Sequence, residues 1–110
     1  MKIAVAATRA DENAEVSPRP GRSKFYLIFD ESGHLLEVMA NPFYRGGGGA
    51  GFGVAKMLQD KEVDIVVGGR FGENMEGALR GRGLRYRAMG GPVKEAMIQV
   101  LRSRTGQNEI

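Results

Sequence analysis

Residues 63–101 read VDIVVGGRFGENMEGALRGRGLRYRAMGGPVKEAMIQVL, and this stretch decides the fold. The apolar run 63–67 predicts a buried strand, and the helical pattern that follows has one apolar face and ends at Gly83. In residues 84–88 apolar side chains alternate with arginines, which is typical of an edge strand with one face in water. Residues 93–101 carry the apolar stripe of a core-facing helix. This strand–helix–strand–helix order favours parallel strands joined by right-handed crossovers.

The preceding half of the chain adds three strands and one helix. Residues 2–7 form a short continuous apolar run, which indicates a strand buried on both faces. Residues 25–29 and 35–39 are strand-like and flank a short turn with a glycine, so they predict a hairpin. The polar residues 9–23 form a long loop before it. A glycine run then leads into a helix that ends near Asp60, with a buried side expected at Phe52, Val54, Ala55 and Leu58.

The order βββαβαβα predicts an α/β fold of three layers, in which helices cover both faces of a mixed five-stranded sheet. The chain has 110 residues, and we expect residues 1–104 to form one domain and residues 105–110 a frayed tail. No apolar run approaches the roughly 20 residues of a membrane span, and the first apolar segment is too short for a signal peptide. We therefore expect a cytoplasmic protein with no membrane partner.

The composition excludes several kinds of catalytic and metal-binding site. The chain has no cysteine, which excludes disulfides, thiolate zinc sites, cysteine nucleophiles and self-ligated iron–sulfur clusters. Sixteen Lys and Arg against thirteen Asp and Glu give a net charge of +3, and the pI is about 9.5. This balance favours anionic partners, but it lacks the clustered basic excess of a dedicated nucleic-acid binder.

The predicted topology brings several loops to one edge of the sheet. The first, third, fourth and fifth strands run parallel, so the segments that follow them emerge together: 8–23, 41–51, 68–72 and 89–92. Three of these segments are glycine-rich and lead into helix N-termini, where free backbone N–H groups and the helix dipole favour an anion. Their arginines could add charge-assisted hydrogen bonds, namely Arg19, Arg22, Arg45 and Arg70. The sequence therefore predicts a site for an oxyanion or an anionic cofactor at this edge.

The run of small residues 46–51 contains more glycines than a helix cap requires. Because each surplus glycine costs backbone entropy, the run suggests the close approach of a ligand, or a mobile loop. Single glycines are explained as well by caps and tight turns, and these are Gly68, Gly72, Gly83 and Gly91.

Other functions are disfavoured by what the motifs lack. Gly46, Gly48 and Gly51 have the glycine spacing of dinucleotide-binding proteins, but a run with so many glycines matches this spacing almost by chance. The next strand also does not end in the acidic residue that would bind a ribose. No lysine followed by Ser or Thr completes a phosphate-binding loop, and the first strand has no carboxylate for two-metal catalysis. The sole histidine, His34, falls in the hairpin turn at the opposite edge, where we expect it to be exposed and without function.

From Met1 to about Arg102 the arrangement resembles the dinitrogenase iron–molybdenum cofactor carrier and biosynthesis family, which includes NifX, the C-terminal part of NifB and orange-protein-like chains. Besides the strand order, the motifs that carry this resemblance are Gly21-Arg22 before the second strand, Asn41-Pro42 ahead of the glycine run, and Gly69, Gly72 and Asn74 at the start of the second helix. The resemblance implies a ribonuclease H-like fold without its acids. It also implies carriage of an iron–molybdenum cofactor, its precursor or a molybdenum–sulfur cluster.

Two family histidines are replaced in this chain. Members of the family usually place one histidine before the Gly-Arg pair and often another before the glycine run, where this chain has Arg19 and either Arg45 or Gly46. A metal centre must then bring its own sulfide and organic ligands and be held without Cys or His ligation. Either the chain binds another anion, such as a thiometallate or a phosphate compound, or it keeps the fold without the cofactor. The candidate cofactor-binding residues are Arg19, Gly21, Arg22, Arg45, Gly46, Gly47, Gly48, Gly49, Gly51, Gly69 and Arg70.

The leading interpretation is a non-enzymatic carrier of an anionic metal–sulfur species, with an acceptor or donor protein as its partner. The alternative is a regulatory or interaction domain that contacts RNA through Arg80, Arg82, Arg85, Tyr86 and Arg87, although nucleic acid is the less favoured partner. A small enzyme acting on a phosphorylated metabolite would have the anion site but lacks an identifiable base or nucleophile.

Overall fold

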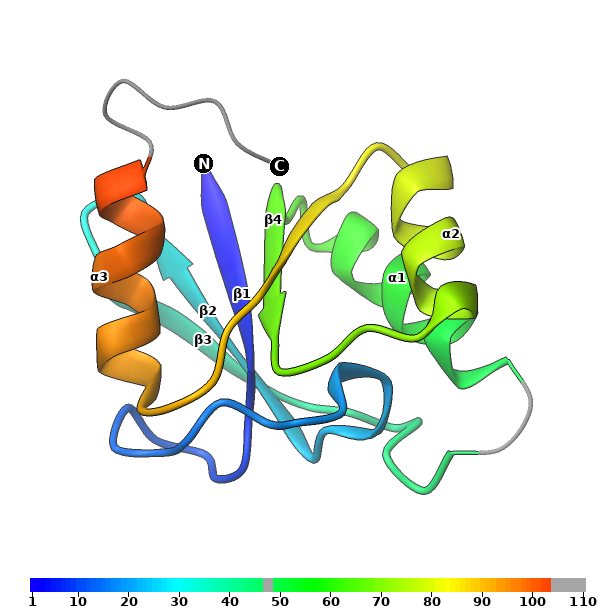
Figure 1. Cartoon of the computed structure of the whole chain (residues 1–110), viewed down its shortest axis with the longest axis horizontal. Coiled ribbons are helices and arrows are strands. Elements are labelled where there is room, and N and C mark those ends of the chain that lie inside the picture. Colours follow the sequence, from blue (N-terminus) through cyan, green and yellow to red (C-terminus); the bar gives the residue numbers. More distant parts are fainter. Residues whose placement is uncertain (47–48, 104–110) are drawn as a thin grey trace.

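The computed structural model describes residues 1–46 and 49–103, which form a five-stranded sheet with helices on both faces (Figure 1). The strands are β1 (Lys2–Ala7), β2 (Phe25–Asp30), β3 (Leu35–Ala40), β4 (Ile65–Gly68) and β5 (Arg85–Ala88). The helices are α1 (Ala50–Asp60), α2 (Glu73–Gly81) and α3 (Val93–Ser103), and a 3-10 turn, η1 (Pro20–Arg22), lies in the first loop.

The strand order is β3-β2-β1-β4-β5. Because β2 is antiparallel to β1 and β3, while β1, β4 and β5 are mutually parallel, β2 is the reversed strand of the sheet. This arrangement confirms the predicted α/β, three-layer, ribonuclease H-like fold. The single domain over residues 1–104 stays a prediction, and the predicted frayed tail, 105–110, lies outside the described residues.

The fourth and fifth strands begin slightly later than the apolar pattern indicated. The N–H of Val63 donates to the carbonyl of Leu58 (3.1 Å), and the N–H of Leu84 donates to the carbonyl of Leu79 (2.9 Å). Each bond belongs to the capping turn that follows the preceding helix, so these apolar residues lie between the helix and the strand. The sheet ladder starts just after them.

Each face of the sheet has its own apolar cluster, and β1 contributes to both. Ile3 and Val5 belong to the cluster under α3, whereas Ala4 and Ala6 belong to the cluster under α1 and α2. Figure 1 shows α3 on one side of the sheet and the other two helices on the opposite side. Residues 3–7 are fully buried, which explains why this strand is apolar without alternation.

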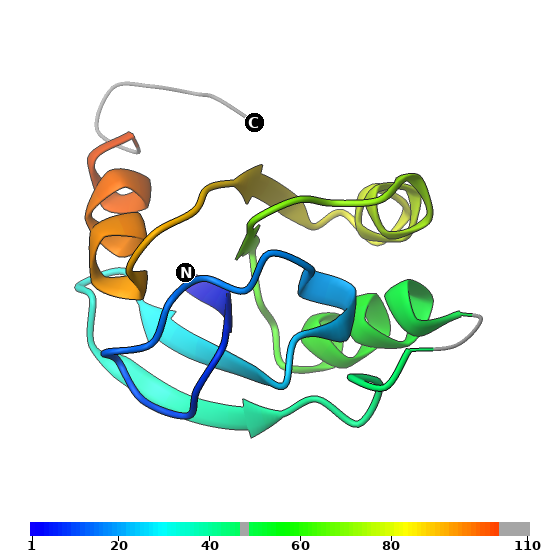
Figure 2. The ribbon, with the colours of Figure 1, turned by 60° about the horizontal axis from the view of Figure 1, so that its bottom comes forward.

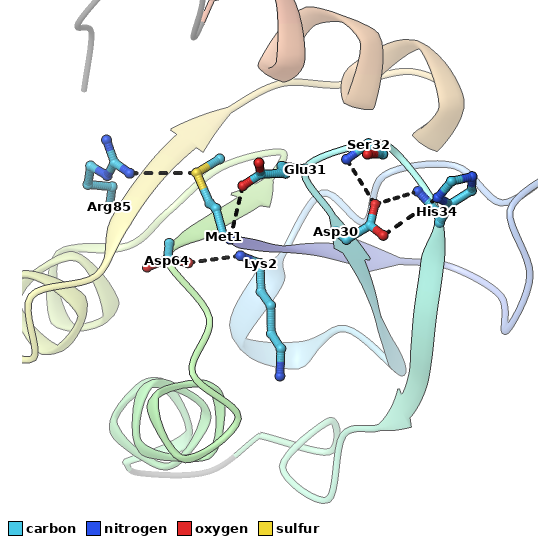
Figure 3. Close-up of polar contacts among 8 residues, drawn as sticks. All are labelled: Met1, Lys2, Asp30, Glu31, Ser32, His34, Asp64 and Arg85. Atoms are coloured by element: carbon cyan, nitrogen blue, oxygen red, sulfur yellow. Dashed lines mark hydrogen bonds and ion pairs between the residues drawn. The ribbon is translucent and has the colours of Figure 1, made fainter.

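The amino-terminal edge of the parallel strands carries charges that are paired with one another (Figure 3). The Asp30 carboxylate accepts hydrogen bonds from the backbone N–H groups of Ser32 and His34, both at 2.9 Å, and the bond from His34 is the main cause that lowers the pKa of Asp30. The N-terminal amine lies 3.2 Å from Glu31 Oε1. Across residues 1–46 and 49–103, no helix is both long and apolar enough to cross a membrane.

Candidate functional site

The opposite edge of the sheet brings together the loops after β1, β3 and β4. In Figure 1 these loops lie below the sheet, and Figure 2 turns this edge forward so that η1 is seen beside the starts of α1 and α2. A pocket of about 640 Å³ lies here. It is lined by Arg19, Pro20, Gly21, Arg22, Gly49, Ala50, Gly51, Phe52, Arg70, Phe71, Gly72, Glu73, Asn74 and Met75.

Three arginines of the pocket have no polar partner among the described residues. The guanidinium groups of Arg19, Arg22 and Arg70 make no hydrogen bond, ion pair or ring contact with any described residue, although Glu73 lines the same pocket. The arginines elsewhere in the described ranges all have such an interaction. The pocket therefore gathers the three described arginines whose guanidinium groups have no polar or ring partner among the described residues.

Two helix N-termini add positive partial charge to the same space. Gly49 caps α1 and Gly72 caps α2, and neither has a side chain that could accept hydrogen bonds from the first-turn N–H groups. Both first turns line the pocket. Because free N–H groups at a helix start attract anions, the helix ends act in the same direction as the arginines.

Hydrogen bonds from the protein interior hold η1 in place. The hydroxyl of the fully buried Tyr26 donates to the carbonyl of Pro20, and burial raises the pKa of Tyr26. The Asn41 side-chain amide donates to the carbonyls of Gly21 (3.3 Å) and Ser23 (2.8 Å). The Ser23 hydroxyl also lies 3.0 Å from the carbonyl oxygen of Ala7. The turn that carries the Gly-Arg pair is thus fixed before any ligand arrives.

Several glycines allow segments of this protein to approach one another. A Cβ added at Gly51 would lie 3.1 Å from Cβ of Met75, and one at Gly69 would lie 2.6 Å from Cα of Pro18. Arg22 similarly occupies the space beside Gly46, whereas a Cβ at Gly49 would meet nothing within 4 Å. The run 46–51 predicts the close approach of a ligand or a mobile loop, but at Gly46 and Gly51 the approaching group is another part of the chain, as it also is at Gly69.

The predicted site residues fall into three groups. Those brought together in the pocket are Arg19, Gly21, Arg22, Gly49, Gly51 and Arg70. Those described but outside its lining are Arg45, Gly46 and Gly69, and Arg45 stacks on the Tyr44 ring at 5.3 Å from the centroid. Gly47 and Gly48 lie outside the described residues.

The segment 89–92 does not join the pocket. Its Gly91 carbonyl accepts a hydrogen bond from the N–H of Val16 (2.8 Å), and the next residue, Val93, donates to the carbonyl of Ala14 (3.0 Å). These bonds tie the start of α3 to the long first loop. Three of the four converging segments therefore build the pocket.

Sequence reasoning did not assign to the site the other side chains that line the pocket, which are Pro20, Ala50, Phe52, Phe71, Glu73, Asn74 and Met75. Phe52 was expected on the buried side of α1, and this prediction is wrong because its side chain is 54% exposed. It lies about a third of a turn around the helix from the mean direction of the buried residues Val54, Ala55 and Leu58. Its place in the first turn after a glycine run was the signal that could have assigned it to the site.

The residues of the RNA-contacting alternative, 80, 82 and 85–87, are divided between the two faces of the sheet. Arg80 bonds the hydroxyl of Tyr86 (2.6 Å) and Arg82 bonds Gln59 (2.7 Å), while Arg87 bonds Ser103 of α3. Tyr86 packs against the cluster under α1 and α2, so the five residues do not form one continuous patch. The RNA-contacting alternative gains no support from this arrangement.

The described residues contain no group of three or more His, Cys, Asp or Glu side chains that could hold a metal ion. His34 is at the far edge of the sheet, is exposed as predicted, and lies 3.6 Å from Asp30 (Figure 3). The described lining of the pocket offers guanidinium and backbone N–H groups, and no histidine or cysteine is among its residues.

Comparison with protein families matches residues 1–103 to the family described as "Dinitrogenase iron-molybdenum cofactor". The chain belongs to this family. A search of curated proteins finds no match to this chain.

Solved structures share the fold of this family member over nearly its whole length. A NifB-like protein from Thermotoga is 30% identical with a TM-score of 0.78, over 94% of this chain and 89% of the other. The apo form of the orange protein from Desulfovibrio gigas is 24% identical with a TM-score of 0.85, over 98% of this chain and 96% of the other.

Proposed function

We propose that this protein binds and carries an anionic metal–sulfur species, such as an iron–molybdenum cofactor or a molybdenum–sulfur cluster, in the pocket between η1 and the starts of α1 and α2. The observation that carries this proposal is a set of three guanidinium groups in one pocket, those of Arg19, Arg22 and Arg70, which have no partner within residues 1–46 and 49–103. Guanidinium groups form strong hydrogen bonds to anions, and these bonds strengthen where water is partly excluded. Family membership supports the choice of cargo.

The remaining walls of the pocket suit a polarisable cargo. Phe52 and Phe71 present aromatic surface, and the thioether of Met75 adds a soft sulfur. A sulfide-covered cluster is larger and less strongly hydrated than a small oxyanion, so contact with these groups favours it more. Cargo of this kind would be held by charge and surface contact while it keeps its own ligands.

We further propose that binding is not followed by a chemical reaction. In the described lining, Glu73 is the one carboxylate, and no Ser, Thr, Cys, His or Lys is present. Acid–base or nucleophilic catalysis requires a base next to a reacting group, usually with a second group that orients it. A carrier needs neither, but it does need an acceptor or donor protein, and the exposed Phe52 at the pocket is a suitable first contact for one.

The proposal is tested by anaerobic titration of the purified protein with tetrathiomolybdate, followed by absorbance, with molybdate as the oxyanion comparison. We expect saturable binding of tetrathiomolybdate that weakens as the salt concentration rises. Arg19→Ala and Arg70→Ala should each lower the affinity about tenfold, the worth of one charge-assisted hydrogen bond.

Arg82→Ala is the matched control, since it removes the same charge from a side chain that bonds Gln59 away from the pocket. This variant should bind as the unmodified protein does. Absence of saturable binding, or equal losses in all three variants, would refute the proposed function and favour the interaction-domain alternative.

A further inference from the structure

We infer that Gly46 is a positioning residue for the pocket, because its bare backbone fixes the place of the Arg22 guanidinium. The inference rests on the proposed function in so far as Arg22 is taken to contact the cargo. Gly46 itself does not line the pocket, so its role would be exerted through Arg22.

The Arg22 guanidinium occupies the space that a side chain at residue 46 would need. A Cβ built on Gly46 would lie 2.6 Å from Cζ and 2.9 Å from Nη2 of Arg22, and it would also meet Nε. Distances below 3.0 Å are essentially never found around real Cβ atoms. The Arg22 guanidinium therefore packs directly against the backbone of Gly46.

The backbone of Gly46 is itself held in a defined turn. Its φ angle is +82°, in the left-handed region that glycine adopts without strain, and its N–H donates to the carbonyl of Phe43 (2.8 Å). The turn thus leaves the side of the Gly46 backbone that faces Arg22 without a side chain.

The same segment, 41–46, also holds the other end of Arg22. At its first residue, the Asn41 side chain donates to the carbonyls of Gly21 and Ser23, on either side of Arg22 in the chain. Asn41 is buried, and its side-chain oxygen accepts the N–H of Phe43 (2.9 Å), so it links both turns. One short segment therefore restrains the backbone of Arg22 at one end and its guanidinium at the other.

Such restraint matters because Arg22 has no ion pair among the described residues to hold it. A long side chain that is free in solution must lose its rotamer freedom when it binds an anion. Packing on Gly46 supplies part of this ordering in advance and keeps the charge at the pocket. A methyl group at residue 46 would displace the guanidinium rather than break the fold, since the atoms it meets are at the end of a flexible side chain.

The test is a double-mutant cycle of Gly46→Ala and Arg22→Ala, with tetrathiomolybdate as the probe. Each single variant should lower the affinity several-fold, whereas Gly46→Ala in the Arg22→Ala background should change it less than about twofold. Gly91→Ala is the control for backbone strain, because Gly91 also has positive φ (+85°) but its Cβ would meet nothing within 4 Å. It should leave the affinity unchanged. The inference would be overturned if Gly46→Ala lowered the affinity by the same factor in the unmodified protein and in the Arg22→Ala background.

A second measurement separates this inference from the proposed function. The side-chain Nε–Hε NMR resonance of Arg22 should shift in Gly46→Ala and stay in place in Gly91→Ala, with no ligand added. If the unmodified protein does not bind tetrathiomolybdate, the proposed function fails, and the NMR comparison still decides whether Gly46 positions Arg22. An unmoved Arg22 resonance in Gly46→Ala would overturn the positioning role.

Discussion

Replacing Tyr26 by phenylalanine removes the hydroxyl that holds η1 from inside the protein. The Tyr26 ring is fully buried and its hydroxyl donates to the carbonyl of Pro20. In the variant this carbonyl, at a buried proline, loses the hydroxyl and keeps the more distant N–H of Ser23 (3.3 Å) as its donor among the described residues. We therefore expect Tyr26→Phe to lower the free energy of unfolding and to loosen the turn that carries Arg22.

The magnitude follows from two terms. Loss of one of the two hydrogen bonds to this carbonyl costs about 0.5–1.5 kcal/mol, and for a chain of this size each kcal/mol lowers Tm by about 4 °C. The second term depends on pH. Because burial raises the pKa of Tyr26, the folded protein keeps this proton above pH 10 while the unfolded chain releases it. The contribution of Tyr26 is thus complete below pH 10 and falls by about 1.4 kcal/mol for each pH unit above it.

The assay is urea denaturation of both proteins at pH 7 and at several values between pH 10 and 11.5. The unmodified protein should be more stable at pH 7, and its advantage over Tyr26→Phe should shrink steadily as the pH rises above 10. Tyr86→Phe is the control, since the Tyr86 hydroxyl bonds an exposed Arg80 and should lose well under 1 kcal/mol. Equal stability of Tyr26→Phe and the unmodified protein at pH 7, or a constant difference at all pH values, would refute the reasoning.

Three further changes test the structure around this framework. Gly77 lies in the exposed middle of α2, where a Cβ would meet nothing within 4 Å. Gly77→Ala should therefore raise the free energy of unfolding by about 0.5–1 kcal/mol. A lower free energy of unfolding in urea denaturation would contradict this. Gly69→Ala should lower the free energy of unfolding by about 1–3 kcal/mol, because its Cβ would press on the backbone of residues 17–18. Gly90→Ala is the control and should change this free energy little, because its Cβ would meet open space. Equal losses of Tm in the two variants would argue against close packing at Gly69. The lowered pKa of Asp30 means that its carboxylate stabilises the hairpin above the ordinary value of 3.8 and stops doing so as the pH falls through the lowered value. Asp30→Asn should therefore lose part of the acid dependence of unfolding measured from pH 5 to pH 2, and an unchanged pH profile would count against the role of this hydrogen-bonded turn.

Much of the fold could be predicted because the periodic signals are local and strong. The unbroken apolar run of β1, the alternation in β5 and the stripe of α3 each occur within about ten residues, and their order restricts the topology to few choices. The ends of elements were less predictable, since Val63 and Leu84 are apolar but bond to helix carbonyls.

The candidate site was predictable in its position and only partly in its residues. Arg19, Arg22 and Arg70 follow parallel strands, and the sheet topology alone brings such segments to one edge. The partner of each glycine could not be read from the sequence, because Gly46 meets Arg22 and Gly51 meets Met75, each more than 20 residues away. These contacts depend on the path of whole loops, which local propensity does not determine.

The arginines of the pocket take no part in either apolar cluster, and this separation has a consequence for how the protein can change. Substitutions at Arg19 and Arg70 alter the charge and ligand type offered to the cargo, while the buried residues that provide folding free energy stay the same. Met75 is the exception, because it belongs to the cluster under α1 and α2 and also lines the pocket. The preference of this pocket for the proposed cargo can therefore diverge among descendants of such a chain, or be redesigned with histidines at the arginine positions, without a compensating change in the core.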